Sequence, residues 1–171
     1  MLERIADWRR PLNFAGFLIC ALLIAAAYYL QFVEGMEPCP LCIFQRVAMF
    51  ALGAVFLIAA LHHPRGRGSY GYAALSTIAA GIGAAIAGRH VWLQSLPADQ
   101  VPSCGPGLNY ILDTFAFFES IAIVLRGSGE CAEVELLWGL SIPLWTLIAF
   151  VGLGLAGILV NTLGAGRAGE R

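Results

Sequence analysis

Two cysteines separated by two residues are the clearest chemical feature of this 171-residue sequence. Cys39 and Cys42 lie in the run Glu37-Pro-Cys-Pro-Leu-Cys42, whose prolines favour an extended chain and place Cys42 near the start of a following helix. The positive end of a helix stabilises a thiolate, the form of cysteine that attacks disulfides and electrophilic rings. The spacing therefore predicts a redox-active pair that opens and closes a small disulfide ring.

Two other uses of the cysteines are possible. The Cys39–Cys42 bond could be static and only brace a loop. Alternatively, four cysteines could form a zinc cage, but Cys104 and Cys131 are far apart in the sequence rather than a second Cys-x-x-Cys. We expect the redox pair, with no bound metal.

The remaining cysteines have different surroundings. Cys104 lies among Pro102, Gly105 and Pro106, and Cys131 follows a glycine-rich stretch, so we expect both in exposed loops. Exposed cysteines can exchange disulfides with a protein partner, although a purely structural bond between them is an alternative. Cys20 lies in an apolar run and is expected to behave as a small buried hydrophobic residue.

The composition indicates that the elements positioning these cysteines lie in a membrane. Hydrophobic residues make up 59% of the chain and charged residues 12%, against about 25% charged in typical soluble domains. A chain this small cannot bury so much apolar surface in a globule. Arginine supplies all ten basic residues without forming a basic stripe, so nucleic acid is not an expected partner.

Four apolar runs are long enough to cross a bilayer, which takes roughly 20 residues of helix. They cover residues 12–33, 43–61, 70–88 and 140–163. The prediction is an all-α membrane protein: one integral domain over 1–171, a bundle of four transmembrane helices. The outer loops are 34–42 and 89–139. Small residues at Gly81, Ala85 and Gly88, and at Gly152 and Ala156, could provide close-packing faces.

The arginines orient the bundle. Seven lie in the two tails and the loop between the second and third runs, against Arg89, Arg126 and the intramembrane Arg46 on the other side. The positive-inside rule then places both termini in the cytoplasm and the two cysteine pairs outside. The first run exceeds the apolar core of a signal peptide, so cleavage is disfavoured.

Residues 108–125 could form a fifth span instead of lying at the surface. Asp113 and Glu119 interrupt this stretch, and each is costly at membrane depth. A fifth crossing would also move Cys131 to the cytoplasm. We expect a short interfacial helix on the outer surface.

Two polar residues could act with the first cysteine pair. Arg46 follows Cys42 by four residues, so it lies on the same helix face one turn deeper. A charge inside a span is energetically costly, so it indicates a specific role. Arg46 either extends toward the headgroups or binds an anionic or carbonyl-bearing partner beside Cys42. His90, at the outer end of the third run, is a candidate neighbour of Arg46.

These residues together resemble a known family. Cys39-Pro-Leu-Cys42-Ile-Phe-Gln-Arg46 is similar to the signature of DsbB, the bacterial disulfide bond formation protein B. Arg89-His90-Val-Trp-Leu-Gln94, the outer Cys104, and Gly129-Glu-Cys131-Ala-Glu extend the resemblance over the four spans and both outer loops.

The resemblance implies a quinone-linked thiol oxidase of the bacterial inner membrane that reoxidises a periplasmic DsbA-type oxidant. It implies that Cys104 forms a mixed disulfide with that partner and that Cys131 is its redox partner. Cys39 and Cys42 would reoxidise this pair, with Cys42 facing a bound ubiquinone or menaquinone and Arg46 assisting there. Electron transfer from DsbA through DsbB to a quinone is a general precedent for this relay.

Two other functions fit parts of the pattern. Reductases similar to the vitamin K epoxide reductase place a Cys-x-x-Cys near a quinone, but typically on their last span rather than the second. A four-span scaffold braced by two disulfides would carry no redox activity. Turnover with a reduced thiol partner and a quinone distinguishes these alternatives.

Overall fold

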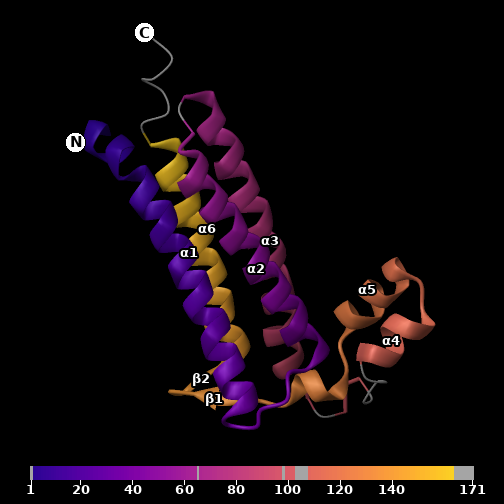
Figure 1. Cartoon of the computed structure of the whole chain (residues 1–171). Helices are drawn as coiled ribbons and strands as arrows, with labels where there is room; N and C mark the ends of the chain where they lie inside the picture. The colour runs from indigo at the N-terminus through magenta and orange to yellow at the C-terminus, as the bar shows by residue number, and fades with distance from the viewer. Residues whose placement is uncertain (1, 65, 98, 103–107, 164–171) are drawn as a thin grey trace.

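The computed structural model describes residues 2–64, 66–97, 99–102 and 108–163, and these form a bundle of four long helices (Figure 1). The long helices are α1 (Leu2–Phe32), α2 (Pro40–His62), α3 (Arg67–Gln94) and α6 (Ile142–Thr162). Between α3 and α6 lie α4 (Leu108–Thr114), α5 (Phe117–Arg126), the 3-10 helix η1 (Gly129–Ala132) and the strands β1 (Leu136–Leu137) and β2 (Leu140–Ser141).

All four long helices are long and apolar enough to cross a membrane, as predicted. At 1.5 Å per residue, the 21 residues of α6 extend about 31 Å, close to the hydrocarbon thickness of about 30 Å. The start of α1 and the end of α6 lie at one end of the bundle, and η1 and the β-hairpin lie at the other (Figure 1). The predicted four-helix membrane bundle is confirmed.

The bundle exposes apolar side chains and buries polar ones. Leu22, Leu61 and Ile78 are more than half exposed, whereas Gln45 and Ser76 are almost completely buried. A soluble bundle shares the apolar core that these helices also have, but it would cover such exposed apolar side chains. Lipid around the helices explains why they stay at the surface.

Helices α3 and α6 approach closely through glycines, but not those of the predicted small-residue faces. A Cβ at Gly154 would lie 2.9 Å from the Ala80 Cβ, and one at Gly157 would lie 2.5 Å from the Ser76 Oγ. At Gly83 an added Cβ would meet the Phe150 ring at 2.2 Å.

The predicted faces were wrong because a glycine pattern does not show which side of a helix meets its neighbour. Cβ atoms built at Gly81, Gly88 and Gly152 would meet no atom of the described residues within 4 Å.

A buried amide pair joins α1 to α6 near the end opposite the cysteines. The Asn13 and Asn161 side chains exchange hydrogen bonds of 3.3 and 3.1 Å, and each is about 1% exposed. Arg9 donates from Nη1 to the Pro64 carbonyl at 3.0 Å, so it ties α1 to the α2–α3 connection. Such bonds between helices in lipid contribute on average about 0.6 kcal/mol each.

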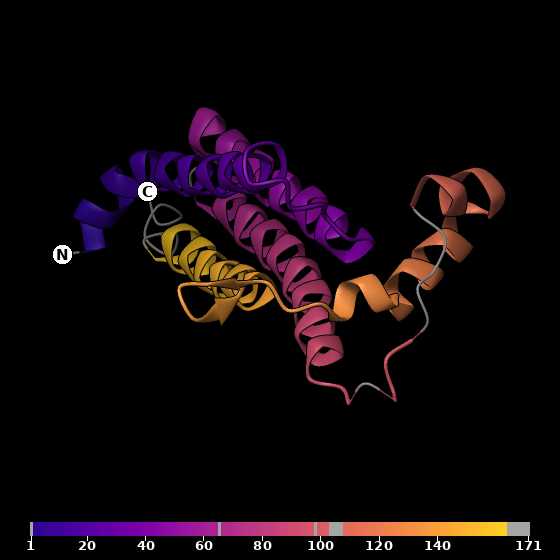
Figure 2. The ribbon, with the colours of Figure 1, turned by 90° about the horizontal axis from the view of Figure 1, so that it is seen from below.

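The segment expected to hold one interfacial helix instead forms two short ones. Helices α4 and α5 have 7 and 10 residues, both too short to span a bilayer, so a fifth span is not formed. They lie beside the cysteine end of the bundle (Figure 2). Their location at a membrane interface stays a prediction. After η1 the chain makes a β-hairpin in which Leu137 pairs with Leu140, turning at Trp138 and Gly139, both with positive φ.

The α3–α6 contact gives a matched test. Gly154→Leu should separate these helices, because overpacking typically costs about 1–3 kcal/mol. Gly152→Leu makes the same change two residues away on the exposed face and should be tolerated. Thermal unfolding of the detergent-solubilised protein measures both. Equal unfolding temperatures for the two variants would contradict this packing.

Candidate functional site

The site begins at the N-terminus of α2. Cys39 is the N-cap residue, with φ −65° and ψ 164°, and Pro40 is the first helical residue. Proline suits this position because its missing N–H would have no partner there. The sequence analysis began this helix at residue 43, so α2 starts three residues earlier than predicted. Cys42 nevertheless falls in the first turn, near the positive end of the helix dipole, as predicted.

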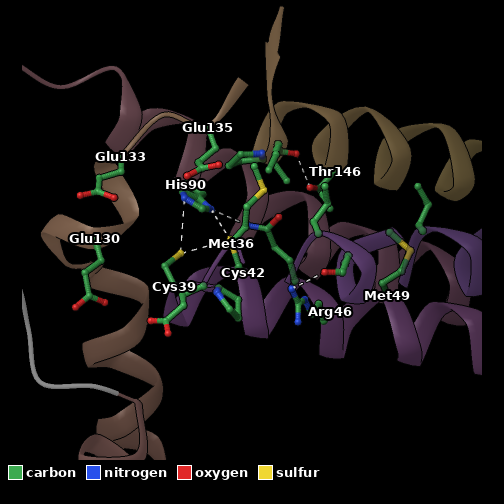
Figure 3. Close-up of a pocket in the computed structure, with 18 of the residues that line it drawn as sticks. Met36, Cys39, Cys42, Arg46, Met49, His90, Glu130, Glu133, Glu135 and Thr146 are labelled. Carbon is green, nitrogen blue, oxygen red and sulfur yellow. Dashed lines mark hydrogen bonds between the residues drawn. The ribbon is translucent and has the colours of Figure 1, made fainter. Parts of the chain in front are cut away.

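The two thiols lie next to each other and share one imidazole. The Sγ atoms of Cys39 and Cys42 are 3.5 Å apart. His90, on the last turns of α3, places Nε2 3.8 Å from the Cys39 Sγ and Nδ1 3.9 Å from the Cys42 Sγ (Figure 3). The ring is 3% exposed. It can therefore exchange protons with either sulfur away from bulk water.

Gln45 completes this cluster and was missed by the sequence analysis. Its amide lies 3.0 Å from the His90 Nδ1, and its side chain is 4% exposed. Gln45 follows Cys42 by three residues, so it lies on the same helix face. The spacing from Cys42 could have indicated Gln45. An uncharged amide inside a span is a weaker sign of a functional site than a charged side chain such as Arg46.

Arg46 contacts helix α1 rather than His90. Its Nη1 donates a short hydrogen bond to Gln31 Oε1, and its Nη2 donates to the Ala27 carbonyl at 3.1 Å. The guanidinium carbon lies 5.1 Å from the centre of the Tyr28 ring. The prediction that Arg46 lies one turn below Cys42 holds. His90 lies near the level of Arg46 and lines the same cavity, and its ring contacts the two thiols and Gln45.

A cavity of about 160 Å³ brings these groups together (Figure 3). Cys42, Arg46, Met49 and His90 line it, together with Thr146 of α6. Its α1 wall is apolar, formed by Leu23, Ile24, Ala27 and Leu30. Glutamates of the segment between α3 and α6 also line the cavity: Glu130, Glu133 and Glu135. The combination of an apolar wall, one cation and a dithiol suits a flat, carbonyl-bearing ring.

Cys131 is buried, which corrects the expectation of an exposed loop. It lies in η1 with 1% of its surface accessible, and its Sγ is 3.8 Å from the Ser128 Oγ. The interaction with the Cys39 thiol, followed by burial, raises the pKa of Cys131 above its ordinary value. Cys131 therefore packs against the first cysteine pair. Cys104 lies outside the described residues.

Polar side chains near the end of α3 hold the Cys131 segment in place. Arg89 donates to the carbonyls of Leu125 and Arg126 at 3.1 and 2.9 Å. Gln94 donates to the Glu133 carbonyl at 2.9 Å. These bonds lie on either side of Cys131 in the sequence, so they fix η1 against α3.

Comparison with known proteins agrees with this arrangement. The family model described as disulfide bond formation protein DsbB matches residues 9–160. A disulfide bond formation protein B from Nitrosococcus oceani is 56% identical, covering 92% of this chain and 94% of its own length. Relatives of the same name from Hahella chejuensis and Methylococcus capsulatus are 54% and 52% identical, each covering 84% of this chain and 87% and 88% of their own lengths.

Fold and site together define a multi-pass membrane protein with a buried dithiol at one end of its helical bundle. The chain belongs to the DsbB family of disulfide bond formation proteins. The resemblance found from the motifs is thus confirmed.

The raised pKa of Cys131 predicts slow alkylation. At pH 8 the reduced, folded protein should have less Cys131 thiolate than an ordinary thiol, because a raised pKa keeps the proton bound. The rate of iodoacetamide labelling at Cys131, measured by peptide mass spectrometry, should keep rising at a pH where free cysteine has levelled off. The same peptide labelled in denaturant is the control. Matching profiles in the two states would contradict the buried thiol.

Proposed function

We propose that this protein is a membrane thiol oxidase that reoxidises a periplasmic DsbA-type dithiol oxidase and passes the electrons to a membrane quinone. The observation that carries the proposal is the order of sulfur atoms at the site. Cys131 packs on Cys39, Cys39 lies 3.5 Å from Cys42, and Cys42 lines the cavity that also contains Arg46. Electrons entering at Cys131 would therefore reach the cavity through adjacent sulfurs.

The proposed exchange conserves atoms and electrons among the four cysteines. With Cys39 and Cys42 joined as a disulfide, the Cys131 thiolate attacks the Cys39 sulfur and the Cys42 thiolate leaves. A second thiolate, proposed to be Cys104, then attacks Cys131 and releases the Cys39 thiolate. The products are one Cys104–Cys131 disulfide and one reduced Cys39–Cys42 pair. Two electrons have moved inward and no outside oxidant has been used.

His90 is proposed to handle the protons of this exchange. Its two ring nitrogens lie 3.8 and 3.9 Å from the two sulfurs of the first pair, so one buried base serves both thiols. As a cation it would stabilise the leaving Cys42 thiolate. As a neutral base it would accept the proton when that thiol is reoxidised. An imidazole suits both roles, because each ring nitrogen can either donate or accept a proton.

The cavity fits a quinone. Its apolar α1 wall suits an isoprenoid tail, and the Arg46 guanidinium provides donors for a carbonyl oxygen. Two bonds to α1 use only part of its five N–H groups. When bound, ubiquinone or menaquinone would supply the two-electron acceptor. The acceptor must lie above the potential of DsbA, about −120 mV, for the reaction to proceed.

The proposed location is the bacterial inner membrane, with both termini cytoplasmic and both cysteine pairs periplasmic. Arg9, Arg10 and Arg67 lie at the bundle end opposite the dithiol, in agreement with the positive-inside rule. The periplasm is the compartment in which disulfides form and persist. A soluble dithiol partner would meet Cys104 there. The protein would then support disulfide bond formation in other chains, a chaperone-like role.

Loss of Cys42 should abolish electron transfer to the quinone. Cys42→Ser removes the sulfur that lines the cavity, so reduced DsbA plus ubiquinone should show no quinone reduction above the uncatalysed rate. Cys20→Ser is the matched control, because Cys20 is buried among α1 and α2 residues away from the dithiol. Persistent turnover in the Cys42 variant would show that the relay is wrong. A reductase acting in the opposite direction would instead oxidise a hydroquinone.

Arg46→Gln should weaken quinone binding without removing the dithiol. Losing a hydrogen bond to a charged group costs about 1.5–3 kcal/mol, which corresponds to a roughly 10- to 150-fold higher KM for quinone. Arg126→Gln removes an exposed arginine side chain outside the cavity and should leave this KM unchanged. Steady-state kinetics at saturating reduced DsbA separate the KM from kcat. An unchanged KM in the Arg46 variant would remove Arg46 from the quinone site.

A further inference from the structure

We propose that the fully reduced form of this centre is a redox-gated binding site for one Zn²⁺ or similar thiophilic cation. Cys39, Cys42, His90 and Cys131 would be its four ligands. This site differs from the zinc cage of four cysteines considered from the sequence, because it uses a histidine from α3. It concerns a cation that enters the reduced protein, not one needed for disulfide formation.

The ligand atoms of Cys39, Cys42 and His90 are close to the spacing that zinc requires. Tetrahedral coordination, with Zn–S about 2.3 Å and Zn–N about 2.0–2.1 Å, places two sulfurs about 3.8 Å apart and a sulfur and nitrogen about 3.6 Å apart. The Cys39 and Cys42 sulfurs are 3.5 Å apart, and the Cys39 Sγ is 3.8 Å from the His90 Nε2. One ligand atom from each of the three residues lies within 4.8 Å of the others. Shifts of a few tenths of an ångström would bring these two distances to the tetrahedral values.

Gln45 can orient the histidine for a metal. A metal-bound imidazole usually donates its other N–H to a neighbouring acceptor, which fixes the tautomer. The Gln45 amide lies 3.0 Å from the His90 Nδ1, and half a turn of that amide would present its oxygen to an Nδ1–H. The Nε2 lone pair would then be directed to the sulfurs. Thus the residue that holds His90 also prepares it as a ligand.

Cys131 would be the fourth ligand. It belongs to the same buried cluster as Cys39 and lies in η1, where Arg89 and Gln94 hold the neighbouring segments to α3. Its Sγ is not among the ligand atoms that lie within 4.8 Å of one another, so the Cys131 side chain would have to turn toward the metal. Glutamates lining the cavity give its outer part a negative field that attracts divalent cations: Glu37, Glu130, Glu133 and Glu135. A set of three cysteines and one histidine is a common closed zinc site.

The site exists only in the reduced protein. A disulfide offers no thiolate, so oxidation of Cys39 and Cys42 removes two ligands at once. Binding replaces the thiol protons, which pass to solvent, and transfers no electrons. The bound cation would hold the dithiol in its reduced form and block its reoxidation. This inhibition rests on the proposed function, whereas the metal binding rests on the ligand geometry alone.

The experiment measures the metal directly, without DsbA or quinone. The full chain in detergent is reduced with a phosphine, separated from it without oxygen, and titrated with Co²⁺ and then Zn²⁺. We expect one cation per reduced chain, with thiolate-to-cobalt charge-transfer bands and the intense visible bands of tetrahedral Co²⁺, displaced by Zn²⁺. Protein oxidised before titration should bind none. Equal binding by oxidised and reduced protein, or none by the reduced protein, would overturn the proposal.

Single variants test the ligand set. His90→Ala and Cys131→Ser should each weaken Zn²⁺ binding by at least 10-fold, and Cys131→Ser should also lower the charge-transfer intensity per cobalt. Gln45→Glu should keep or tighten binding, since a carboxylate is the stronger partner of a metal-bound histidine. Cys20→Ser is the control and should match the parent. Circular dichroism verifies that each variant is folded, and unchanged binding in a folded His90 or Cys131 variant would exclude that ligand.

The outcome is separable from that of the proposed function. If the reduced protein binds Zn²⁺ but shows no turnover with reduced DsbA and quinone, the metal site stands and the thiol oxidase proposal fails. If the protein turns over and 1 equivalent of Zn²⁺ neither binds nor inhibits, the oxidase stands and the metal site fails. A chelator added to inhibited enzyme should restore the rate, because no covalent bond has been made.

Discussion

The close approach of α3 to α6 is the contact on which the dithiol site depends. Gly154 and Gly157 let α6 lie directly on α3, and the Phe150 ring fills the space above Gly83. With α3 held there, its last turns carry His90 to the thiols of α2, while Arg89 and Gln94 bind the segment that contains Cys131. The chemistry lies at one end of the bundle, but its position is set by packing along the bundle.

Burial gives the four described cysteines different environments. Cys20 and Cys131 are each about 1% exposed, Cys39 is almost as well covered, and Cys42 is partly exposed at the cavity. A soluble protein partner cannot reach a thiol as enclosed as Cys131 without moving η1. This explains, under the proposed relay, why two pairs are needed: one cysteine must be accessible to a protein, while another must be enclosed beside a membrane-soluble acceptor.

The same closeness that favours sulfur exchange also favours metal capture. Adjacent thiols and an imidazole that are shielded from water favour thiol–disulfide exchange. The same groups are the ligands that zinc prefers. Under both proposals, a disulfide between Cys39 and Cys42 would also protect the site from metals, because it removes two thiolate ligands. The glutamates around the cavity would make such protection more useful, since they attract cations toward the dithiol.

The sequence by itself determined the number of spans, the closeness of Cys39 to Cys42 and the family. Apolar run length is a local property, and Cys39, Cys42 and Arg46 are close in the sequence, so helical geometry alone places them on one face. The acidic residues within 108–125 also argued against a fifth span. The sequence did not indicate that this segment forms two short helices, α4 and α5.

Only the tertiary structure decided which glycines lie between α3 and α6, that Cys131 is buried in one cluster with Cys39, and that His90 contacts both thiols. Each of these depends on how one helix is rotated about its axis relative to another. That rotation is set by the sum of many weak side-chain contacts between distant segments, so no short motif encodes it. The Cys39–Cys42 pair was visible as a motif, but the buried cluster around it exists only because α3 and η1 pack against α2.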